Sequence, residues 1–395
     1  MRILLDYRPA LTERTGVGEY VHQLAKALGS RQRESGARPS TGPPASSVPA
    51  DSVDVFTSSW KDRPSPGVLS ELAGKAEVID RRWPVRMLNA AWYRLEMPPV
   101  EWLTGRRYDV VHSPCPLLIP ARHAARVVTI HDLDFLRHPE RTRAEMQRVY
   151  PALVARHAAR ADGIIVVSQH VAEQVQSLLH VEAERISVCP NGVVPWTSAA
   201  RVAPGNPEGR YLLFFGTLEP RKNVDGLLAA YASLVVRRPD VPPLRLVGRA
   251  VQGAEAWREK VSTPPLAGRV TYDGYIEASR RQDLYMGARL LALPSFDEGF
   301  GLTAAEAMSL GVPVVASKCG ALPEVTGGAA ILVDPEDIAG LSLAMERVVF
   351  DAGLARRLAE DGLRHIRRFT WERAADLTYA AYGRAIEARR GRVGG

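Results

Sequence analysis

Residues 289–306 read RLLALPSFDEGFGLTAAE and contain the pattern that decides the fold. The apolar run Arg289–Pro294 has the length and composition of a strand that is buried on both faces. Apolar residues then recur at helical spacing as far as Leu310. Between the two, Gly299 and Gly301 let the backbone approach a ligand closely. A strand covered by helices on both faces is typical of a parallel α/β sheet.

The same alternation of apolar runs and amphipathic segments recurs along the chain and predicts two doubly wound α/β domains. The first set of expected strands is Arg2–Asp6, Val53–Thr57, Tyr108–His112, Arg126–His131, Gly163–Ser168 and Arg185–Cys189. The second set is Tyr211–Gly216, Leu244–Gly248, Val270–Tyr272, Arg289–Pro294, Pro313–Ser317 and Ala330–Val333.

Proline and glycine place the domain boundary. They are dense in Val194–Gly209, which predicts a linker between an amino-terminal domain over residues 1–195 and a carboxy-terminal domain over residues 210–371. Residues Ser30–Asp51 lack periodicity and predict a long loop inside the first domain.

Composition excludes several classes of protein. The chain has 395 residues, of which 46% are hydrophobic, so it is long enough for two cores. Its net charge of +7 comes mostly from scattered arginine, which favours a solvated surface over a nucleic-acid interface. Three cysteines fit a reducing compartment, and we expect a cytoplasmic protein. We expect neither a signal peptide nor a membrane span, because no apolar run is long enough.

A candidate anion site follows the expected strand Tyr211–Gly216. Asn223 is a good N-cap, so Arg221 and Lys222 stand at the start of a helix. Two cations beside free helix N–H groups favour an anionic ligand. Taken alone, the same pair equally fits a solvated surface turn.

A second candidate site lies in residues 289–306. The backbone amides of Phe300, Gly301 and Leu302 would bind a phosphate or sugar oxygen. The carboxylates of Glu298 and Glu306 would accept hydrogen bonds from sugar hydroxyls, with Glu306 on a ribose diol. The alternative is that Glu298 caps the helix and that Glu306 is merely exposed.

These motifs carry a family resemblance. Glu298 and Glu306 match the E-x7-E motif of retaining glycosyltransferases, and EAMxxGxPVVAS (residues 306–317), GALPE (320–324) and LVDP (332–335) continue the match. The chain thus resembles family 4 of the glycosyltransferases. The resemblance implies the GT-B fold, in which two Rossmann-like domains face each other across a cleft, and a last helix (372–395) that packs back on the first domain. GTLEPRKN, residues 216–223, resembles the mannosyltransferase-like branch.

The resemblance also implies residue roles. It places the diphosphate of a nucleotide-sugar donor on Arg221 and Lys222, and the donor sugar on Glu298. His131 and a loop at Gly16 and Gly18 would contact the donor or the acceptor. The remaining donor-site residues that it implies are Gly216, Thr217, Gly299, Phe300, Gly301, Leu302 and Glu306. Many members of the family have arginine where this chain has Thr217, so we expect Lys222 to bind the phosphates most strongly.

We therefore expect a retaining, metal-independent transfer of a sugar to a hydroxyl of a glycan or lipid-linked acceptor, with no cofactor beyond the nucleotide-sugar co-substrate. GDP-mannose is the first choice of donor and a UDP-sugar the second. The alternatives are a non-catalytic nucleotide-sugar-binding protein and a GT-B epimerase. A dehydrogenase is disfavoured, because the loop at Gly16 and Gly18 lacks the third glycine of a dinucleotide fingerprint.

Two further segments each allow two interpretations. Asp132-Leu-Asp134 resembles a metal-binding Asp-x-Asp, but we expect it to be structural and expect no bound metal. The segment Arg81–Arg107 mixes tryptophan with arginine. We favour a core helix that is broken at Pro98 and Pro99, and the alternative is a peripheral membrane contact.

Overall fold

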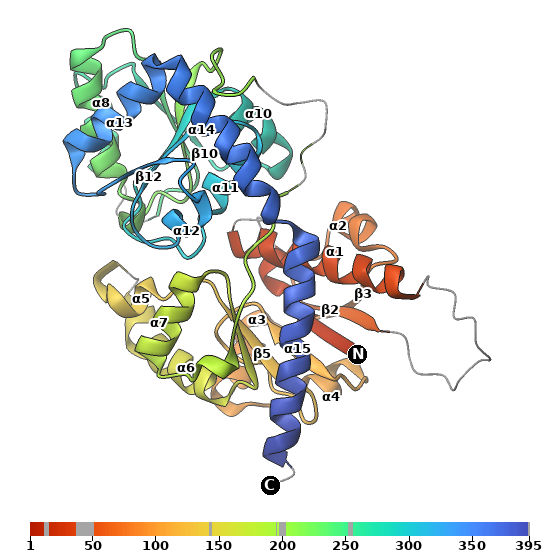
Figure 1. The fold of residues 1–395 in the computed structure, drawn as a ribbon. Coiled ribbons are helices and arrows are strands. Elements are labelled where there is room, and N and C mark those ends of the chain that lie inside the picture. The colour runs from red at the N-terminus through yellow and green to blue at the C-terminus, as the bar shows by residue number, and fades with distance from the viewer. Residues whose placement is uncertain are drawn as a thin grey trace. The chain divides into compact units, whose positions relative to one another are not determined.

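The computed structural model describes residues 1–11, 16–36, 51–141, 144–194, 196, 203–251 and 256–393. The chain divides into two units, one formed by Met1–Gly192 with Thr370–Gly395 and the other by Val193–Phe369. Each unit is built on a parallel sheet of its own (Figure 1). Within the described ranges, no helix is both long enough and apolar enough to cross a membrane.

The first unit has a seven-stranded sheet in the order β3-β2-β1-β4-β5-β6-β7. Its strands are β1 (Arg2–Asp6), β2 (Ser52–Ser58), β3 (Glu77–Arg81), β4 (Val110–Ser113), β5 (Ala125–Ile130), β6 (Gly163–Val166) and β7 (Ile186–Val188). Its helices are α1 (Gly16–Gly36), α2 (Pro66–Leu72), α3 (Val85–Ala90), α4 (Val100–Thr104), α5 (Asp134–Arg137), α6 (Ala144–Arg160), α7 (Gln169–Leu179) and α15 (Trp371–Val393).

The second unit has a six-stranded sheet in the order β10-β9-β8-β11-β12-β13. Its strands are β8 (Tyr211–Phe215), β9 (Leu244–Val247), β10 (Val270–Gly274), β11 (Ala288–Leu293), β12 (Val314–Ser317) and β13 (Ile331–Val333). Its helices are α8 (Val224–Arg237), α9 (Ala256–Val261), α10 (Arg281–Met286), α11 (Leu302–Ser309), α12 (Leu322–Thr326), α13 (Ile338–Phe350) and α14 (Ala352–His365).

The sequence predicts every strand of both sheets except β3, with ends correct to within two residues. The central strands are easy to find because helices cover both faces, so β6 and β11 are apolar almost throughout. Strand β3 is at the edge of its sheet, reads EVIDR and buries only Ile79 fully. Its polar residues interrupt the apolar run by which the central strands are recognised.

Helix α15 belongs to the first unit although it comes last in the chain. It packs against α1, β5 and β6, and its residues Trp371, Ala375 and Tyr382 lie in the same buried cluster as Leu24 and Val127. The core of the first unit is thus made from both ends of the chain.

Two loop predictions are wrong in part. Helix α1 continues to Gly36, into the expected loop Ser30–Asp51, and Arg31 contacts Asp376 and the ring of Tyr379 on α15. These contacts hold α1 against α15 at Arg31, inside the expected loop. Residues 37–50 lie outside the described residues.

The expected linker Val194–Gly209 also contains folded structure. Asn206 is buried, and its side-chain amide donates to the carbonyl oxygen of Met286 at 2.9 Å. Residues 203–209 therefore form a turn on the second unit, while residues 195 and 197–202 lie outside the described part.

The segment Arg81–Arg107 is only partly core. Leu88 and Trp92 are buried, and the indole N–H of Trp92 donates to the carbonyl oxygen of Pro98 at 3.0 Å. Met87 and Trp102 are exposed. One face of the segment therefore packs against the sheet and another face meets solvent.

Candidate active site

The strand order of the second sheet places the candidate site. Strand β8 lies between β9 and β11, so the chain reverses its direction of winding beside β8. Ligands of α/β folds bind outside the carboxyl ends of the strands at such a point. The two candidate segments, residues 216–223 and 294–301, follow β8 and β11 and therefore meet at this edge.

Lys222 and Glu298 form an ion pair at this edge. The Lys222 Nζ donates to Glu298 Oε1 at 2.6 Å, and the Ser295 hydroxyl donates to the same oxygen at 2.8 Å. Both side chains of the pair are largely buried. The structure thus joins two residues that are 76 positions apart in sequence. It adds Ser295, which lies in the stretch 289–306 and which sequence reasoning missed.

Arg221 ties the two segments together. Its guanidinium donates to the carbonyl oxygen of Asp297 at 2.9 Å and to Glu219 Oε1 at 2.8 Å, and it lies 3.8 Å from Glu298 Oε2. The backbone amide of Phe296 donates to the carbonyl oxygen of Arg221 at 2.8 Å. Arg221 therefore positions the loop that carries Glu298 and also adds positive charge there.

Two cations keep Glu298 ionised. Burial alone would raise the pKa of this carboxyl, but the charges of Lys222 and Arg221 and the hydrogen bonds from Lys222 and Ser295 outweigh burial and lower the pKa below its ordinary value. The site thus contains a buried carboxylate held between two cations at neutral pH.

The start of α11 completes this edge. Its N-cap is Gly301, whose φ of 91° suits glycine, and no side chain caps the helix there, so Glu298 is not a helix cap. The ring of Phe300 packs against Phe369 at 5.5 Å between ring centroids, so only its backbone is available to a ligand. Leu302 is the first residue of α11, and the first backbone amides of a helix have no hydrogen-bond partner within the helix.

Glu306 is buried rather than exposed. Tyr285 donates its hydroxyl hydrogen to Glu306 Oε2 at 2.7 Å, and an Arg281 nitrogen lies 3.6 Å from Glu306 Oε1. Tyr285 and Arg281 lie one turn apart on α10, and sequence reasoning missed both. Their four-residue spacing was the available signal, but nothing in it indicated a carboxylate partner on another helix.

Gly216 and Thr217 follow β8 directly. The amide of Gly216 donates to the carbonyl oxygen of Val247 at 2.9 Å. A Cβ on Gly248 would lie 1.9 Å from the Gly216 carbonyl oxygen, so the chain requires glycine where β8 and β9 end. Thr217 is half-buried next to this close approach.

Known protein families match a large part of each unit. The family described as Glycosyl transferases group 1 matches residues 209–351, and the one described as Glycosyltransferase Family 4 matches residues 50–195. The chain is 32% identical over 301 residues to the O-antigen chain mannosyltransferase B of Escherichia coli, and the match covers 73% of this chain and 78% of that relative. The chain belongs to the group 1, family 4 glycosyltransferases.

Other similarities agree with this membership. The glycosyltransferase is 31% identical over 307 residues to the D-inositol 3-phosphate glycosyltransferase of Stackebrandtia nassauensis, covering 73% of this chain and 66% of that relative. Its fold resembles that of sucrose-phosphate synthase from Thermosynechococcus elongatus, with a TM-score of 0.72 and 21% identity. The match covers 98% of this chain and 100% of the synthase chain. Two Rossmann-like units with this likeness constitute the GT-B fold, as the sequence predicts.

The first unit of this glycosyltransferase contains the remaining predicted residues. Helix α1 begins at Gly16, so Gly16 and Gly18 lie in its first turn and not in a loop before it, which corrects the expectation. Residues 12–15 lie outside the described residues. Tyr20, two residues after Gly18, packs edge-on against His131 with 4.7 Å between ring centroids. The structure therefore brings His131 to the start of α1.

His131 follows β5, and its tautomer is fixed by a backbone group. Its Nε2 lies 3.1 Å from the carbonyl oxygen of Pro114, so Nε2 carries the proton and Nδ1 is left as an acceptor. Burial lowers the pKa of His131, although the charge of Asp132 opposes this shift. His131 is neutral at pH 7.

A buried polar chain that sequence reasoning missed lies behind His131. The Tyr20 hydroxyl is 3.1 Å from Thr129 Oγ1, His112 Nε2 is 2.7 Å from the same oxygen, and His112 Nδ1 is 2.7 Å from the Tyr382 hydroxyl. Burial and the nearby His131 lower the pKa of His112 to about 3. This chain of hydrogen bonds joins α1, β4, β5 and α15.

Across the described ranges, no cluster of three or more His, Cys, Asp or Glu side chains is arranged to hold a metal ion. Asp134 is buried in the first turn of α5.

Proposed function

We propose that this glycosyltransferase transfers mannose from GDP-mannose to a hydroxyl of a glycan or glycolipid, with retention of anomeric configuration and without a metal ion. The observation that carries the proposal is the pair of Lys222 and Glu298 at the switch point of the second sheet. The mannosyltransferase at 32% identity supports the choice of sugar and of a glycan acceptor.

Lys222 is suited to bind the donor diphosphate. Its ammonium group has three donor hydrogens, and Glu298 takes one of them. Negative charge grows on the diphosphate as it leaves the sugar, so a preorganised cation stabilises the transition state more than the ground state. The first amides of α11 add donors to the same edge.

Glu298 is better suited to bind sugar hydroxyls than to attack the sugar. Its Oε1 already accepts two hydrogen bonds, and two cations lower its basicity. We therefore propose front-face attack. The bond between sugar C1 and the phosphate oxygen breaks, the acceptor oxygen bonds to C1 on the same face, and the acceptor proton passes to the leaving phosphate oxygen.

His131 would then orient a hydroxyl of the donor or the acceptor. A neutral imidazole with Nδ1 free of the proton accepts a hydrogen bond and does not act as a cationic acid. We propose that it binds substrate through Nδ1.

A donor screen followed by product analysis tests the proposal. Thermal unfolding is measured with GDP-mannose, UDP-glucose and ADP-glucose, each in the presence of EDTA. A donor at 100 times its Kd stabilises by about 2.7 kcal/mol, and we expect this for GDP-mannose. NMR of the mannosyl product then reports the anomeric configuration.

Other outcomes would replace parts of the proposal. Stabilisation by UDP-sugars alone would change the donor, and interconversion of a UDP-sugar without acceptor would indicate an epimerase. Donor binding with neither hydrolysis nor transfer would indicate a non-catalytic binding protein. An inverted product would overturn front-face attack.

A further inference from the structure

A basic hollow of about 620 Å³ lies on the first unit, and no residue of the candidate active site lines it. It is lined by Asp109 and Ala125, which stand at the amino ends of β4 and β5. Substrates of α/β folds bind at the carboxyl ends, so this hollow is at the opposite edge of the sheet. Its volume is in the range of ligand sites.

Positive charge dominates the lining, which contains Arg107, Arg122, Arg389 and Arg390 against the single carboxylate of Asp109. That carboxylate already accepts a hydrogen bond from the backbone amide of Arg2 at 2.7 Å. Arg107 and Arg390 are exposed, and among the described residues neither guanidinium has a hydrogen-bond or ion-pair partner.

Residues around the hollow add to this excess of positive charge. Arg389 donates to the backbone carbonyl oxygens of Arg122 and His123 at 2.7 and 3.0 Å, which fixes the wall of the hollow. Among the described residues its one carboxylate partner is Asp162, which is shared with Arg126 and Arg392. A single buried carboxylate among three guanidinium groups leaves net positive charge behind the wall.

An exposed tryptophan stands beside this charge. Trp102 of α4 is 58% exposed, and the guanidinium of Arg122 lies 5.1 Å from its ring centroid. Tryptophan next to arginine is typical of surfaces that rest at the level of lipid headgroups, where one end of the side chain is apolar and the other is wet.

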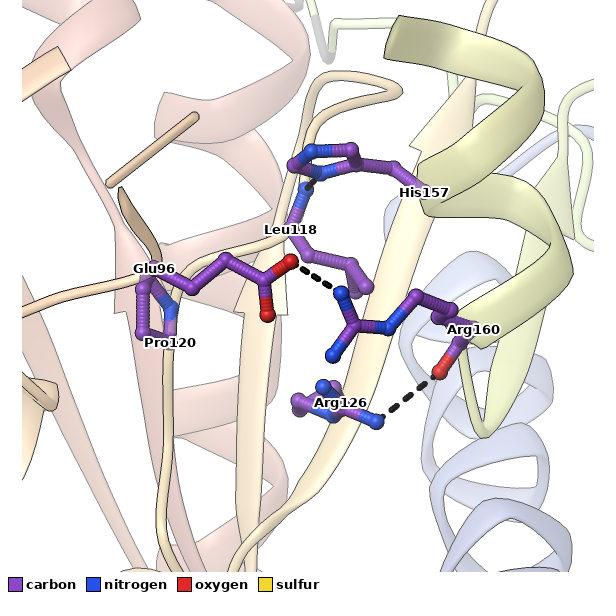
Figure 2. A pocket seen from close by; sticks show the side chains of 6 residues that line it. All are labelled: Glu96, Leu118, Pro120, Arg126, His157 and Arg160. Atoms are coloured by element: carbon purple, nitrogen blue, oxygen red, sulfur yellow. Dashed lines mark hydrogen bonds and ion pairs between the residues drawn. The ribbon is translucent and has the colours of Figure 1, made fainter. Parts of the chain in front are cut away.

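A second, much smaller hollow on the first unit contrasts with this one. Figure 2 shows Glu96 directed at Arg160, and the backbone amide of Leu118 donating to His157 Nδ1. Its volume is about 10 Å³, enough for one water molecule. Its charges are paired and its space is closed, so it is structural, whereas the larger hollow is open and its lining has more arginines than carboxylates.

We propose that the hollow at Arg107, Arg122 and Arg390, with Trp102 beside it, docks the first unit on a membrane surface that carries anionic phospholipid headgroups. Guanidinium groups bind phosphate oxygens in a fork geometry. Docking through the amino edge leaves the carboxyl edge of the same sheet open to substrate. The inference goes beyond the proposed function and does not depend on it.

Vesicle flotation tests the proposal with the full chain and no donor. The chain should float with vesicles of phosphatidylglycerol and phosphatidylcholine, stay behind with pure phosphatidylcholine, and dissociate at 1 M salt, where the Debye length is about 3 Å. The double variant Arg107→Ala/Arg390→Ala should bind roughly 25-fold more weakly, at about fivefold, or 1 kcal/mol, per arginine. Trp102→Ala should weaken binding further.

Matched controls remove the same groups elsewhere. Arg357→Ala/Arg373→Ala takes two exposed arginines from other surfaces, and Trp60→Ala takes a tryptophan that is 72% exposed just after the carboxyl end of β2. These variants should float like the wild type. Equal binding to neutral and anionic vesicles, or equal loss in the controls, overturns the proposal. So does binding of free glycerol phosphate without any vesicle binding, which would make the hollow a site for a soluble phosphate.

Discussion

The substitution Lys222→Ala separates the two roles of Lys222. It removes a cation from the donor site and also removes the partner that lies 2.6 Å from the buried Glu298 carboxylate. Breaking a buried pair from one side costs about 3–5 kcal/mol. Ser295 still donates to Glu298, and Arg221 remains 3.8 Å away, so we expect the lower end, about 3 kcal/mol.

Turnover should fall more than stability alone explains. Loss of one preorganised group that stabilises transition-state charge costs about 10²-fold in kcat. The assay is release of GDP from saturating GDP-mannose at 25 °C, alongside denaturant unfolding of the same samples. Lys222→Ala/Glu298→Gln removes the orphaned charge, so it should regain stability and not turnover.

The matched control is Lys318→Ala. Lys318 pairs with Asp334 at 3.0 Å in the same unit, but the two side chains are 60% and 43% exposed. A surface pair contributes at most about 1 kcal/mol, and turnover should be unchanged. The reasoning is refuted if Lys222→Ala turns over donor within threefold of the wild type, or if the double variant regains turnover.

Three further predictions follow from the same structure. Glu306→Gln should weaken nucleotide binding by about 10- to 100-fold in calorimetry, because a charge-assisted hydrogen bond is worth about 1.5–3 kcal/mol; unchanged affinity removes the ribose assignment. Gly320→Ala should lower the free energy of unfolding by more than about 1–2 kcal/mol, because its φ is 63° and its Cβ would lie 2.5 Å from the Glu298 amide nitrogen. The control Gly328→Ala also has a positive φ, 83°, but no atom lies within 4 Å of its Cβ, so it should show only the cost of the left-handed backbone. The pKa of His112 is about 3 in the folded chain and 6.5 ordinarily. As pH falls from 6.5 toward 3, the unfolded chain takes up a proton at this histidine and the folded chain does not, so the free energy of unfolding that is present above pH 6.5 is progressively lost. Between pH 7 and 5, His112→Gln should therefore lose about 2 kcal/mol less unfolding free energy than the wild type, and equal losses would contradict the assignment.

The sequence predicts what depends on local pattern. Strands such as β8 and β11 are apolar because both faces are covered, and Asn223 caps α8 by accepting from the Gly226 amide, as its position indicates. These features need only neighbours in sequence.

Features that depend on distant partners could not be predicted in the same way. Buried Glu306 accepts a hydrogen bond from Tyr285 on another helix, and α1 enters the expected loop with its Arg31 paired to Asp376 of α15. The pairing of Lys222 with Glu298 likewise requires β8 and β11 to be adjacent. A linear pattern indicates that these residues bind something, but not that they bind each other.

The return of α15 to the first unit has a consequence for biosynthesis. Residues 193–369 form one uninterrupted stretch, so the second unit can acquire its structure as soon as it leaves the ribosome. The first unit is translated earlier yet lacks Trp371, Ala375 and Tyr382 until translation reaches them. The unit made first is therefore finished last. Apolar residues of α1 such as Leu24 are left without their α15 partners for as long as synthesis of the intervening 177 residues takes, which gives chaperones a target on the nascent chain.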